Sequence, residues 1–385
     1  MRRLRRRLNR RFYRWLHRFY RAVFPTPPWP GRIVPASLRR VLLVRDDGYI
    51  GDMVVTTPLV AFLNTAAPHL EIDILASPKT AALLAADTRV TRVFANDHTW
   101  RGWLRVLRAL RARRYDAVFS VIYGKGLREG LTASMIARRG AYKLSIWRPK
   151  RYRGFFTAVT RPPASLPHMA DQLLYLGHRV LGLRPPGLNG AARYPMRVAV
   201  DDASDARAAR FLAEREISAF IVVNLDSTDQ WRSWRPEPCA QFVRAVLDRH
   251  PDVSVVLPPA PGKEGHAEEV ARLCGSSRVI VARAFRVLEL TALLARSLGV
   301  VTPNTGVLHL AVAVGRPIVA LYTLQSVHVE RWLPWGVPYR AVVGAPGEAV
   351  SDIAPSRIVE AFDDLFHDLA VPDAIPNAAR AVQQA

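Results

Sequence analysis

The sequence predicts an α/β protein made of two doubly wound parallel sheets. Three observations lead to this expectation. The chain has 385 residues, more than one hydrophobic core usually organises, and half of them are hydrophobic. From residue 40 onward, short apolar runs alternate with helical segments, which is typical of parallel strands joined by crossover helices. A segment rich in proline and glycine at 183–195 interrupts this alternation, which then restarts, and this predicts a domain boundary.

The elements are expected in alternation along both halves. In the first half we expect strands near 41–44, 72–75, 92–94, 117–121 and 143–146, and helices near 58–67, 79–86, 103–113, 127–138 and 169–181. In the second half we expect strands near 220–224, 254–257, 279–281, 299–301 and 317–322, and helices near 238–249, 264–273, 287–295 and 307–314. The predicted domains are 36–185 and 190–370, followed by a flexible tail at 371–385. The last helix, 356–369, could pack back on the N-terminal half.

The N-terminus is a basic arm. The net charge is +23, and no acidic residue precedes Asp46, whereas arginines crowd the first two dozen positions. Apolar residues recur there at steps of three and four, which predicts an amphipathic helix; they are Leu4, Leu8, Phe12, Trp15, Phe19 and Val23. We expect residues 1–24 to bind an anionic membrane surface, with aromatic rings in the acyl boundary. A nucleic-acid-binding or merely solvated tail is the alternative, because a basic run alone does not select its polyanion.

Residues 1–30 therefore form an arm that ends in a proline-rich linker at 25–30. The sequence contains no run of roughly 20 apolar residues and no signal-peptide core, so we expect a cytoplasmic protein attached peripherally to the inner membrane. Cys239 and Cys274 stand apart with no cluster of metal ligands, which favours reduced packing residues and no metal site.

The first candidate site follows the first predicted strand, where the chain reads RDDGYIGDMV from Arg45. Ligands of α/β sheets bind outside the carboxyl ends of strands, and Gly48 and Gly51 permit a tight loop there. Asp52 follows the second glycine, where its carboxylate could take a proton from an attacking hydroxyl. Alternatively Asp52 only caps the following helix. Capping is the favoured role of Asp46 and Asp47.

The second candidate site is a turn between a strand and an apolar helix, in the segment 299–315. A helix N-terminus offers free amides to a phosphate, and Gly306 permits close approach. Thr305 adds a hydroxyl, and His309 lies one turn into the helix. Alternatively Asn304 or Thr305 is an ordinary N-cap and His309 is a buried histidine between domains.

The third candidate site is the loop 226–236, which contains QWRSWRP after a predicted strand. Its arginines and indoles could clamp a nucleotide diphosphate, with Arg232 and Trp234 among them. Solvated arginines packed on tryptophan are the alternative.

Together, these three segments resemble glycosyltransferase family 9, the heptosyltransferases of lipopolysaccharide core assembly. The resemblance extends over about residues 41–369 and includes VLLVRDDGYIGDMVVTTP, the QWRSWRP loop and TPNTGVLHLAVAVGRPIVALY. It implies a GT-B fold, in which two Rossmann-like domains face each other across a cleft. It also implies an inverting, metal-independent transfer without a cofactor, with the nucleotide sugar held by the C-terminal half.

The resemblance also assigns roles to single residues. Asp52 matches the aspartate regarded as the base, and Arg232 matches a basic residue that meets the donor phosphates. Thr305, Gly306 and His309 match a diphosphate-binding turn, beside which Asn304 and Trp234 are donor-site neighbours. Two departures are evident: Asn304 stands where many members have aspartate, and the segment 321–326 replaces a Phe-Gly-Pro-Thr stretch.

We therefore expect a transfer from a nucleotide sugar, with ADP-heptose as the candidate donor, to a lipopolysaccharide core or a related lipid-linked glycan. Candidates on the acceptor side are Arg45, Gly51, Lys125 and Arg128, and further basic residues there are Lys143, Arg148, Lys150, Arg151 and Arg153. A nucleotide-sugar epimerase on the same fold is the enzymatic alternative. The alternative without enzymatic activity is a membrane-docked binding protein. We do not expect nucleic acid to be a partner.

Overall fold

The computed structural model of the chain describes residues 22–123, 127–183, 190–325 and 328–370. The chain divides into two compact units, Met1–Tyr194 and Pro195–Ala385, and each is described here by itself. The amphipathic helix predicted before residue 22, the predicted tail at 371–385 and Lys125 lie outside the described residues.

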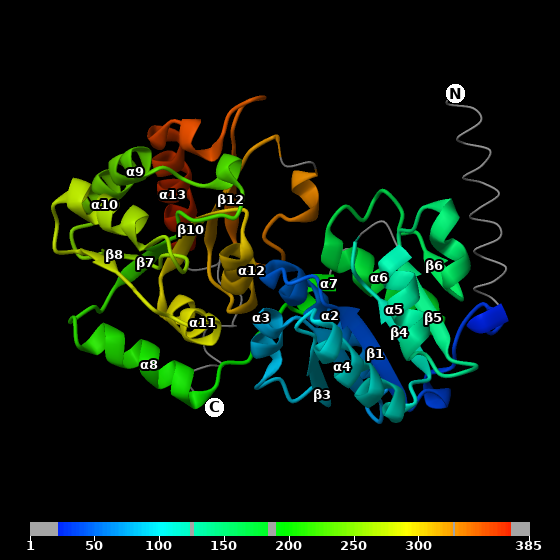
Figure 1. Cartoon of the computed structure of the whole chain (residues 1–385). Helices are drawn as coiled ribbons and strands as arrows, with labels where there is room; N and C mark the ends of the chain where they lie inside the picture. Colours follow the sequence, from blue (N-terminus) through cyan, green and yellow to red (C-terminus); the bar gives the residue numbers. More distant parts are fainter. Residues whose placement is uncertain (1–21, 124–126, 184–189, 326–327, 371–385) are drawn as a thin grey trace. The chain divides into compact units, whose positions relative to one another are not determined.

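The N-terminal unit contains a six-stranded sheet in the order β3-β2-β1-β4-β5-β6, and every pairing in it is parallel (Figure 1). The strands are β1 (Arg40–Arg45), β2 (Glu71–Ala76), β3 (Arg92–Ala95), β4 (Ala117–Ser120), β5 (Tyr142–Ile146) and β6 (Ala158–Thr160). Central strands such as β1 are almost entirely buried, because helices cover both faces of the sheet. Its helices are α2 (Ile50–Ala66), α3 (Pro78–Ala81), α4 (Trp100–Arg113), α5 (Leu127–Ile136), α6 (Met169–Leu181) and α7 (Gly190–Arg193).

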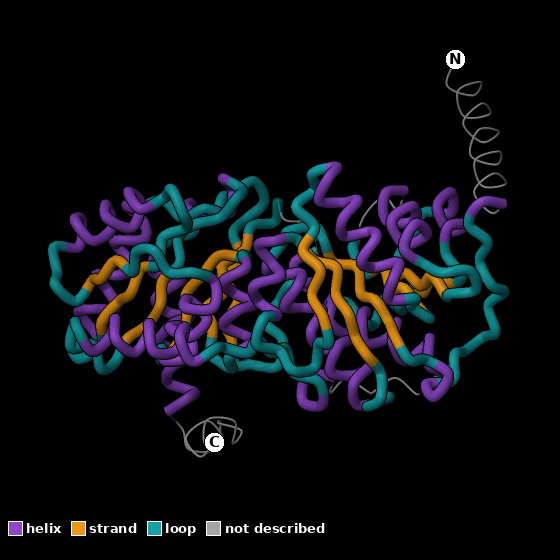
Figure 2. Tube along the Cα trace, turned by 60° about the horizontal axis from the view of Figure 1, so that its bottom comes forward, coloured by secondary structure: helices purple, strands orange, loops and turns teal. Residues whose placement is uncertain are grey.

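The C-terminal unit repeats this architecture with the order β12-β11-β10-β7-β8-β9, again all parallel. The strands are β7 (Phe220–Val223), β8 (Ser254–Leu257), β9 (Val279–Val281), β10 (Gly299–Pro303), β11 (Ile318–Tyr322) and β12 (Tyr339–Val343). The helices are α8 (Asp202–Ala213), α9 (Pro236–Arg249), α10 (Glu264–Cys274), α11 (Val287–Arg296), α12 (Gly306–Ala313) and α13 (Pro355–Ala370). Figure 2 shows the strands of each unit as one layer between helices. The predicted α/β class with two parallel sheets is confirmed.

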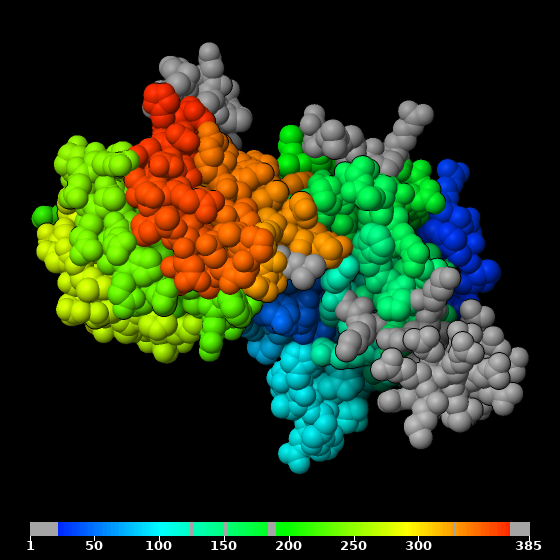
Figure 3. Space-filling model, turned by 90° about the horizontal axis from the view of Figure 1, so that it is seen from above, coloured from blue at the N-terminus to red at the C-terminus, as the bar shows by residue number. Residues whose placement is uncertain are grey.

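Short 3-10 helices complete the description: η1 (Pro35–Ser37), η2 (Ala82–Leu84), η3 (Lys150–Phe155), η4 (Gln230–Arg232), η5 (Val329–Arg331) and η6 (Val350–Asp352). The last helix, α13, packs on α9, β11 and β12 of its own unit, and its red segment lies against orange ones in Figure 3. Its buried face includes Phe362 and Leu365, which belong to the core cluster of that unit. Cys239 and Cys274 are free cysteines.

The main local error of the sequence prediction concerns α2, which begins at Ile50 and not near Pro58. Proline has no N–H to donate to the carbonyl of Val54, and such a loss usually ends a helix. Here the Thr57 hydroxyl donates to that carbonyl at 2.7 Å. The helix therefore continues through Pro58, and it carries Asp52 in its first turn.

Among the described strands and α-helices, four were not expected: β6, β12, α7 and α8. The strand β6 has three half-buried residues, and β12 is partly exposed, so neither has a clear apolar run. The helix α8 begins at a capping Asp201 in a stretch that is mostly small and charged. Within the described part of the chain, no helix has both the length and the apolar character needed to span a bilayer.

Candidate functional site

The loop after β1 is shorter than the sequence indicated, and it leads directly into α2. Gly48 has a φ of 79°, in the left-handed region that favours glycine, and it reverses the chain between strand and helix. Gly51 is not part of this loop, because it is the second residue of α2. The cap position belongs to Tyr49, which makes no side-chain cap. Asp52 thus lies in the first helical turn at the carboxyl edge of the sheet.

Arg45 holds the carboxylates of this loop. It is the last residue of β1 and is completely buried. Its Nη1 atom lies 3.1 Å from Oδ2 of Asp47 and 3.4 Å from Oδ1 of Asp52. Its Nε donates to the Thr56 hydroxyl at 3.0 Å, and that hydroxyl donates to the carbonyl of Asp52 at 2.8 Å. The strand end therefore positions both the side chain and the backbone of Asp52.

The environment of Asp52 raises the pKa of its carboxyl to about 6. Burial is the largest cause, because it disfavours the charged form, and the negative charge of Asp47 adds to it. The guanidinium of Arg45 acts in the opposite direction. A carboxylate with this pKa is ionised at neutral pH and still has useful basicity, which is what a general base requires.

The carboxylate of Asp46 is more deeply buried than that of Asp52, and two donors from other segments neutralise it. Its Oδ2 accepts from Asn96 at 3.1 Å and from Nη2 of Arg128 at 3.0 Å. Asp46 is 3% exposed, whereas the Arg128 side chain is 61% exposed. The Arg128 side chain is therefore largely exposed to solvent, although its ion pair with Asp46 connects it to the loop that follows β1.

Three of the basic residues expected on the acceptor side are buried, which a sequence pattern does not reveal. Arg45 is engaged with Asp47 and Asp52, as described above. Arg148 donates to the Ser120 hydroxyl and the Ile122 carbonyl, and burial lowers its pKa to about 10. Lys143 is 1% exposed and lies near the amino end of β5, at the sheet edge opposite to Asp52. Alternating strand patterns do not show which basic side chains point inward.

In the C-terminal unit, the turn after β10 is organised by Asn224, a residue that sequence reasoning missed. Asn224 follows β7, the neighbour of β10. Its Nδ2 donates to the hydroxyls of Thr302 at 3.0 Å and Thr305 at 3.3 Å. Thr305 is the N-cap residue of α12, yet its side chain makes no cap bond. The first amides of α12 are thus not satisfied by the Thr305 hydroxyl, which Asn224 holds.

The structure brings the second and third candidate segments together. Arg232 ends η4, and its Nη1 donates to the carbonyl of Asn304 at 3.3 Å. Its Nε also lies 3.3 Å from Oδ2 of Asp229, and its side chain is 29% exposed. A partly open guanidinium therefore lies beside the start of α12, 72 residues away in sequence.

Trp234, which the sequence analysis named as a donor-site neighbour, fills a core position of the C-terminal unit. It is 1% exposed, belongs to the core cluster, and packs its ring 5.5 Å from that of Phe242. The other indole of the loop, Trp231, is 48% exposed. A sequence pattern with two tryptophans does not reveal which one fills the core.

His309 is buried in α12, one turn after Gly306, and its ring packs edge-on against Trp332 at 5.9 Å. Trp332 follows η5, and its carbonyl accepts from the Tyr322 hydroxyl at 2.9 Å. Tyr322 belongs to the segment that departs from the family pattern. A residue of the departing segment, Tyr322, therefore holds the backbone of Trp332, and the Trp332 ring contacts His309.

A further polar cluster that the sequence did not indicate joins β7 to α10. Asp226 is 7% exposed, and its Oδ2 accepts from the Ala260 amide at 2.8 Å. Its Oδ1 lies 3.3 Å from Nδ1 of His266 and 3.9 Å from Nζ of Lys263. Lys263 also donates to the Ser227 carbonyl at 2.8 Å. These contacts anchor the loop that carries Arg232, and the position of Asp226 three residues after β7 is the one signal that could have suggested them.

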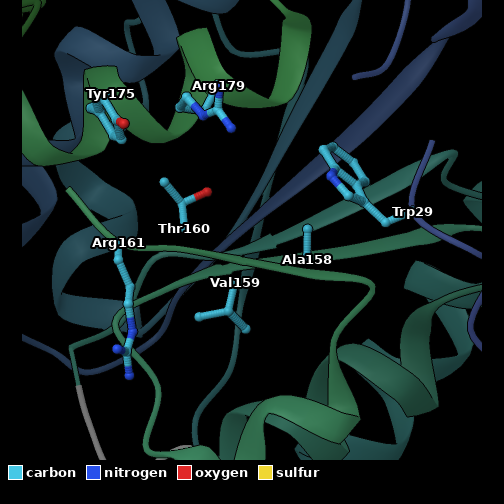
Figure 4. Close-up of a pocket in the computed structure, with 7 residues that line it drawn as sticks. All are labelled: Trp29, Ala158, Val159, Thr160, Arg161, Tyr175 and Arg179. Atoms are coloured by element: carbon cyan, nitrogen blue, oxygen red, sulfur yellow. The ribbon is translucent and has the colours of Figure 1, made fainter. Parts of the chain in front are cut away.

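Away from these loops, a pocket of about 210 Å³ opens in the N-terminal unit (Figure 4). Tyr175 and Arg179 reach it from α6, and Trp29 comes from the proline-rich linker. Among the described residues, no group of three His, Cys, Asp or Glu side chains could hold a metal ion.

Comparisons with known proteins agree with this architecture. The sequence profile of the family described as glycosyltransferase family 9 (heptosyltransferase) matches residues 103–352. Lipopolysaccharide heptosyltransferase 3 of Escherichia coli (strain K12) is 22% identical over 301 residues, which cover 74% of this chain and 83% of that protein.

Two solved structures share the fold. The family 9 glycosyl transferase from Veillonella parvula DSM 2008 superposes with a TM-score of 0.75 at 19% identity, covering 87% of this chain and 98% of that one. The ADP-heptose lps heptosyltransferase II of E. coli superposes with a TM-score of 0.69 at 18% identity, covering 86% and 99%.

Proposed function

Because the chain belongs to glycosyltransferase family 9 (heptosyltransferase), we propose that it transfers heptose from ADP-heptose to a lipopolysaccharide core or a related lipid-linked glycan, with inversion and without a metal ion. The enzyme is a heptosyltransferase-like glycosyltransferase with a GT-B fold. The observation that carries the mechanistic proposal is the Asp52 carboxylate, which Arg45 holds at the carboxyl edge of the sheet with a pKa of about 6.

In the proposed reaction, the carboxylate of Asp52 removes the proton of an acceptor hydroxyl. The hydroxyl oxygen then forms a bond to the anomeric carbon of the sugar, on the face opposite to the diphosphate. The bond between that carbon and the diphosphate oxygen breaks, and the nucleoside diphosphate leaves with the electron pair. A single displacement of this kind inverts the anomeric centre, and it needs one base and one stabilised leaving group.

The leaving diphosphate is assigned to the C-terminal unit. At the start of α12, the free backbone amides and the Thr305 hydroxyl would donate hydrogen bonds to the diphosphate oxygens. Arg232, beside Asn304, would add a positive charge. His309 donates from the same helix in this proposal. These groups supply the positive charge that a metal ion would otherwise provide, so we propose that none is required. The relative named for ADP-heptose supports the choice of donor.

We assign the acceptor to the N-terminal unit and propose that Arg128 is the main residue that binds it. Arg128 joins Asp46 and is largely exposed, so its guanidinium can meet a phosphorylated sugar. The relative named for lipopolysaccharide supports this class of acceptor. We propose that residues 1–24 hold the enzyme at the cytoplasmic face of the inner membrane, where such an acceptor lies. The arginines of the arm would meet anionic headgroups there.

The decisive assay measures release of ADP from ADP-heptose, with and without a lipopolysaccharide acceptor that lacks the terminal sugar. Wild type and Asp52→Asn are compared, with Asp252→Asn, an exposed turn carboxylate of the other unit, as the matched control. The proposal expects release that needs the acceptor, that is lost in Asp52→Asn and that persists in the control. Acceptor-independent turnover of the donor would favour an epimerase, and no binding of the donor would exclude both enzymes.

Three finer parts of the proposal have their own measurements. The anomeric configuration of the product sugar tests inversion, and full activity in a chelator tests metal independence. Deletion of residues 1–21 should abolish sedimentation with anionic vesicles while leaving the described fold intact. Unchanged sedimentation would assign the membrane contact to another surface.

A further inference from the structure

The helix α4 of the N-terminal unit has two faces of different character. Its inner face is apolar: Leu110 belongs to a core cluster of the unit, and Trp103, Val106 and Leu107 pack against that cluster. This packing accounts for the place of the helix on the sheet. The outer face is exposed, and in Figure 3 the cyan segment that includes the start of α4 protrudes from its unit.

Two large apolar side chains lie on the outer face. Trp100 is 68% exposed and Leu104 is 38% exposed, and no other large hydrophobic side chain of the described residues is more exposed than Trp100. The two are four residues apart, so they are neighbours on the surface of the helix. Neither contributes to the core. Apolar side chains that are grouped and exposed in this way indicate a contact surface.

Arginines surround this apolar pair, and α4 contains no acidic residue. The exposed arginines of the helix are Arg101, Arg105, Arg108 and Arg111. Within the described part of the chain, none of these four makes an ion pair, whereas Arg113, which is 14% exposed, pairs with Glu71 and Asp73. Asp97, before the helix, interacts with Arg105 only at longer range and accepts from the Thr99 amide. The outer face is therefore strongly basic.

The combination of these side chains favours one kind of partner. A helix that lies on a membrane presents aromatic and aliphatic side chains to the acyl boundary and guanidinium groups to anionic headgroups. Nucleic acid would pair with the arginines but would leave Leu104 in water. The guanidinium of Arg101 lies 5.2 Å from the centre of the Trp100 ring, so a positive charge accompanies the exposed indole.

We propose that the outer face of α4 docks on an anionic membrane surface, with Trp100 and Leu104 at the acyl boundary and the four arginines among the headgroups. The proposal rests on the proposed membrane location of the enzyme, but it adds a second contact, separate from the N-terminal arm. One shallow contact gives weak and reversible binding, so the helix and the arm act together. The contact brings the unit assigned to the acceptor to the surface that carries lipid-linked glycans.

The first test removes the exposed indole from the full-length protein. Trp100→Ser is compared with Trp231→Ser, which removes a half-exposed indole of the other unit. Sedimentation with phosphatidylcholine vesicles that contain phosphatidylglycerol measures binding, and circular dichroism checks the fold. We expect Trp100→Ser to bind on the order of tenfold more weakly than wild type, and the control to match wild type. Equal binding of the two variants would overturn the proposal.

The second test removes charge from the same face. Arg105→Gln combined with Arg108→Gln is compared with Arg161→Gln combined with Arg179→Gln, two exposed arginines of the same unit outside α4. We expect the α4 pair to weaken binding by roughly fivefold for each arginine, and only when the vesicles contain phosphatidylglycerol. An equal loss in both pairs would show that net charge alone attracts the protein, and it would overturn the assignment to α4.

The third test asks whether the ring inserts. Trp100→Phe keeps an aromatic side chain and should keep vesicle binding, while it removes one indole. With brominated phosphatidylglycerol, which quenches indoles among acyl chains, this variant should lose less fluorescence on binding than wild type and Trp231→Phe. Trp15 of the arm contributes equally to all three proteins. Quenching of Trp100→Phe equal to that of wild type would overturn the proposal.

Release of ADP from ADP-heptose with a soluble acceptor that lacks its lipid separates this proposal from the transfer reaction. Trp100→Ser should retain that activity, because α4 carries no group assigned to the reaction. Failure of wild type to release ADP would contradict the transfer proposal and leave the vesicle results standing. A loss of activity in Trp100→Ser together with unchanged vesicle binding would place α4 at the acceptor and overturn the membrane assignment.

Discussion

In the N-terminal unit, Nη1 of Arg45 lies 3.4 Å from Oδ1 of Asp52, and this contact joins the end of β1 to the first turn of α2. The guanidinium is completely buried, whereas the Asp52 side chain keeps 20% of its surface exposed. Arg45 lowers the pKa of Asp52, while burial and Asp47 raise it, and the net result is a pKa of about 6. The pair therefore keeps the carboxylate ionised at neutral pH and accessible to a substrate hydroxyl.

The first prediction concerns the pH dependence of transfer. Only the ionised form of Asp52 accepts a proton, so kcat/KM should rise with pH and level off above a midpoint near pH 6. Initial rates at subsaturating acceptor, from about pH 4 to about pH 8, would measure this limb. A rate that stays flat through this range would argue against Asp52 as the base.

The second prediction changes the partner of the base. Arg45→Met removes the charge that lowers the pKa of Asp52, so the acidic limb should move to higher pH, whereas Arg45→Lys should largely retain its position. The same rate profiles measure both variants, and circular dichroism checks that they fold. If the limb of Arg45→Met coincided with that of wild type, the contact would have no electrostatic role.

The third prediction concerns stability. The pKa of Asp52 is about 6 in the folded protein, above the ordinary value of 3.8. Folding therefore favours the protonated carboxyl, and this contribution to stability is complete below pH 3.8 and is lost as the pH rises through 6. Above pH 6 the ionised carboxylate thus costs up to about 3 kcal/mol, which Asp52→Asn avoids. Asp52→Asn should be inactive and yet unfold at a higher temperature than wild type at neutral pH.

Thermal unfolding at several pH values would check this, with Asp252→Asn as the control. The advantage of Asp52→Asn should shrink toward acidic pH, because the wild-type carboxyl is protonated there. A variant that is less stable than wild type at neutral pH would contradict the assigned burial cost.

The fourth prediction tests the contact between the two donor segments. Arg232→Gln removes the guanidinium beside Asn304, and we expect the KM for the donor to rise on the order of tenfold or more, since charged hydrogen bonds to the diphosphate are lost. Arg235→Gln, in the same loop, removes an exposed arginine paired with Asp352 and should leave this KM nearly unchanged. Similar donor kinetics in the two variants would remove Arg232 from the site.

The fifth prediction separates the two indoles of the same loop. Trp234→Ala should lower the free energy of unfolding by about 3–5 kcal/mol, because it empties a core position. Trp231→Ala should change it by less than about 0.5 kcal/mol, because Trp231 is half exposed. Chemical denaturation measures both values, and equal losses would show that the burial assigned to Trp234 is wrong.

Much of the candidate segment in each unit could be predicted from local patterns. The glycines, Asp52 and the turn with Thr305 and Gly306 occur directly after apolar runs, and the carboxyl ends of parallel strands are where α/β proteins bind ligands. The start of α2 could not be predicted in the same way. Pro58 is a strong helix breaker locally, yet α2 continues through it, and the Thr57 hydroxyl donates to the Val54 carbonyl that the proline cannot reach.

The sequence by itself determined the two parallel sheets and the family, because apolar periodicity and short motifs are local properties of the chain. Tertiary structure alone decided which charged and aromatic side chains are buried. Arg45, Lys143 and Trp234 look like surface or binding residues in the sequence, yet all three are buried. Burial depends on packing between segments far apart in the chain, as when Asn224 reaches the hydroxyl of Thr305, and a local pattern does not contain that information.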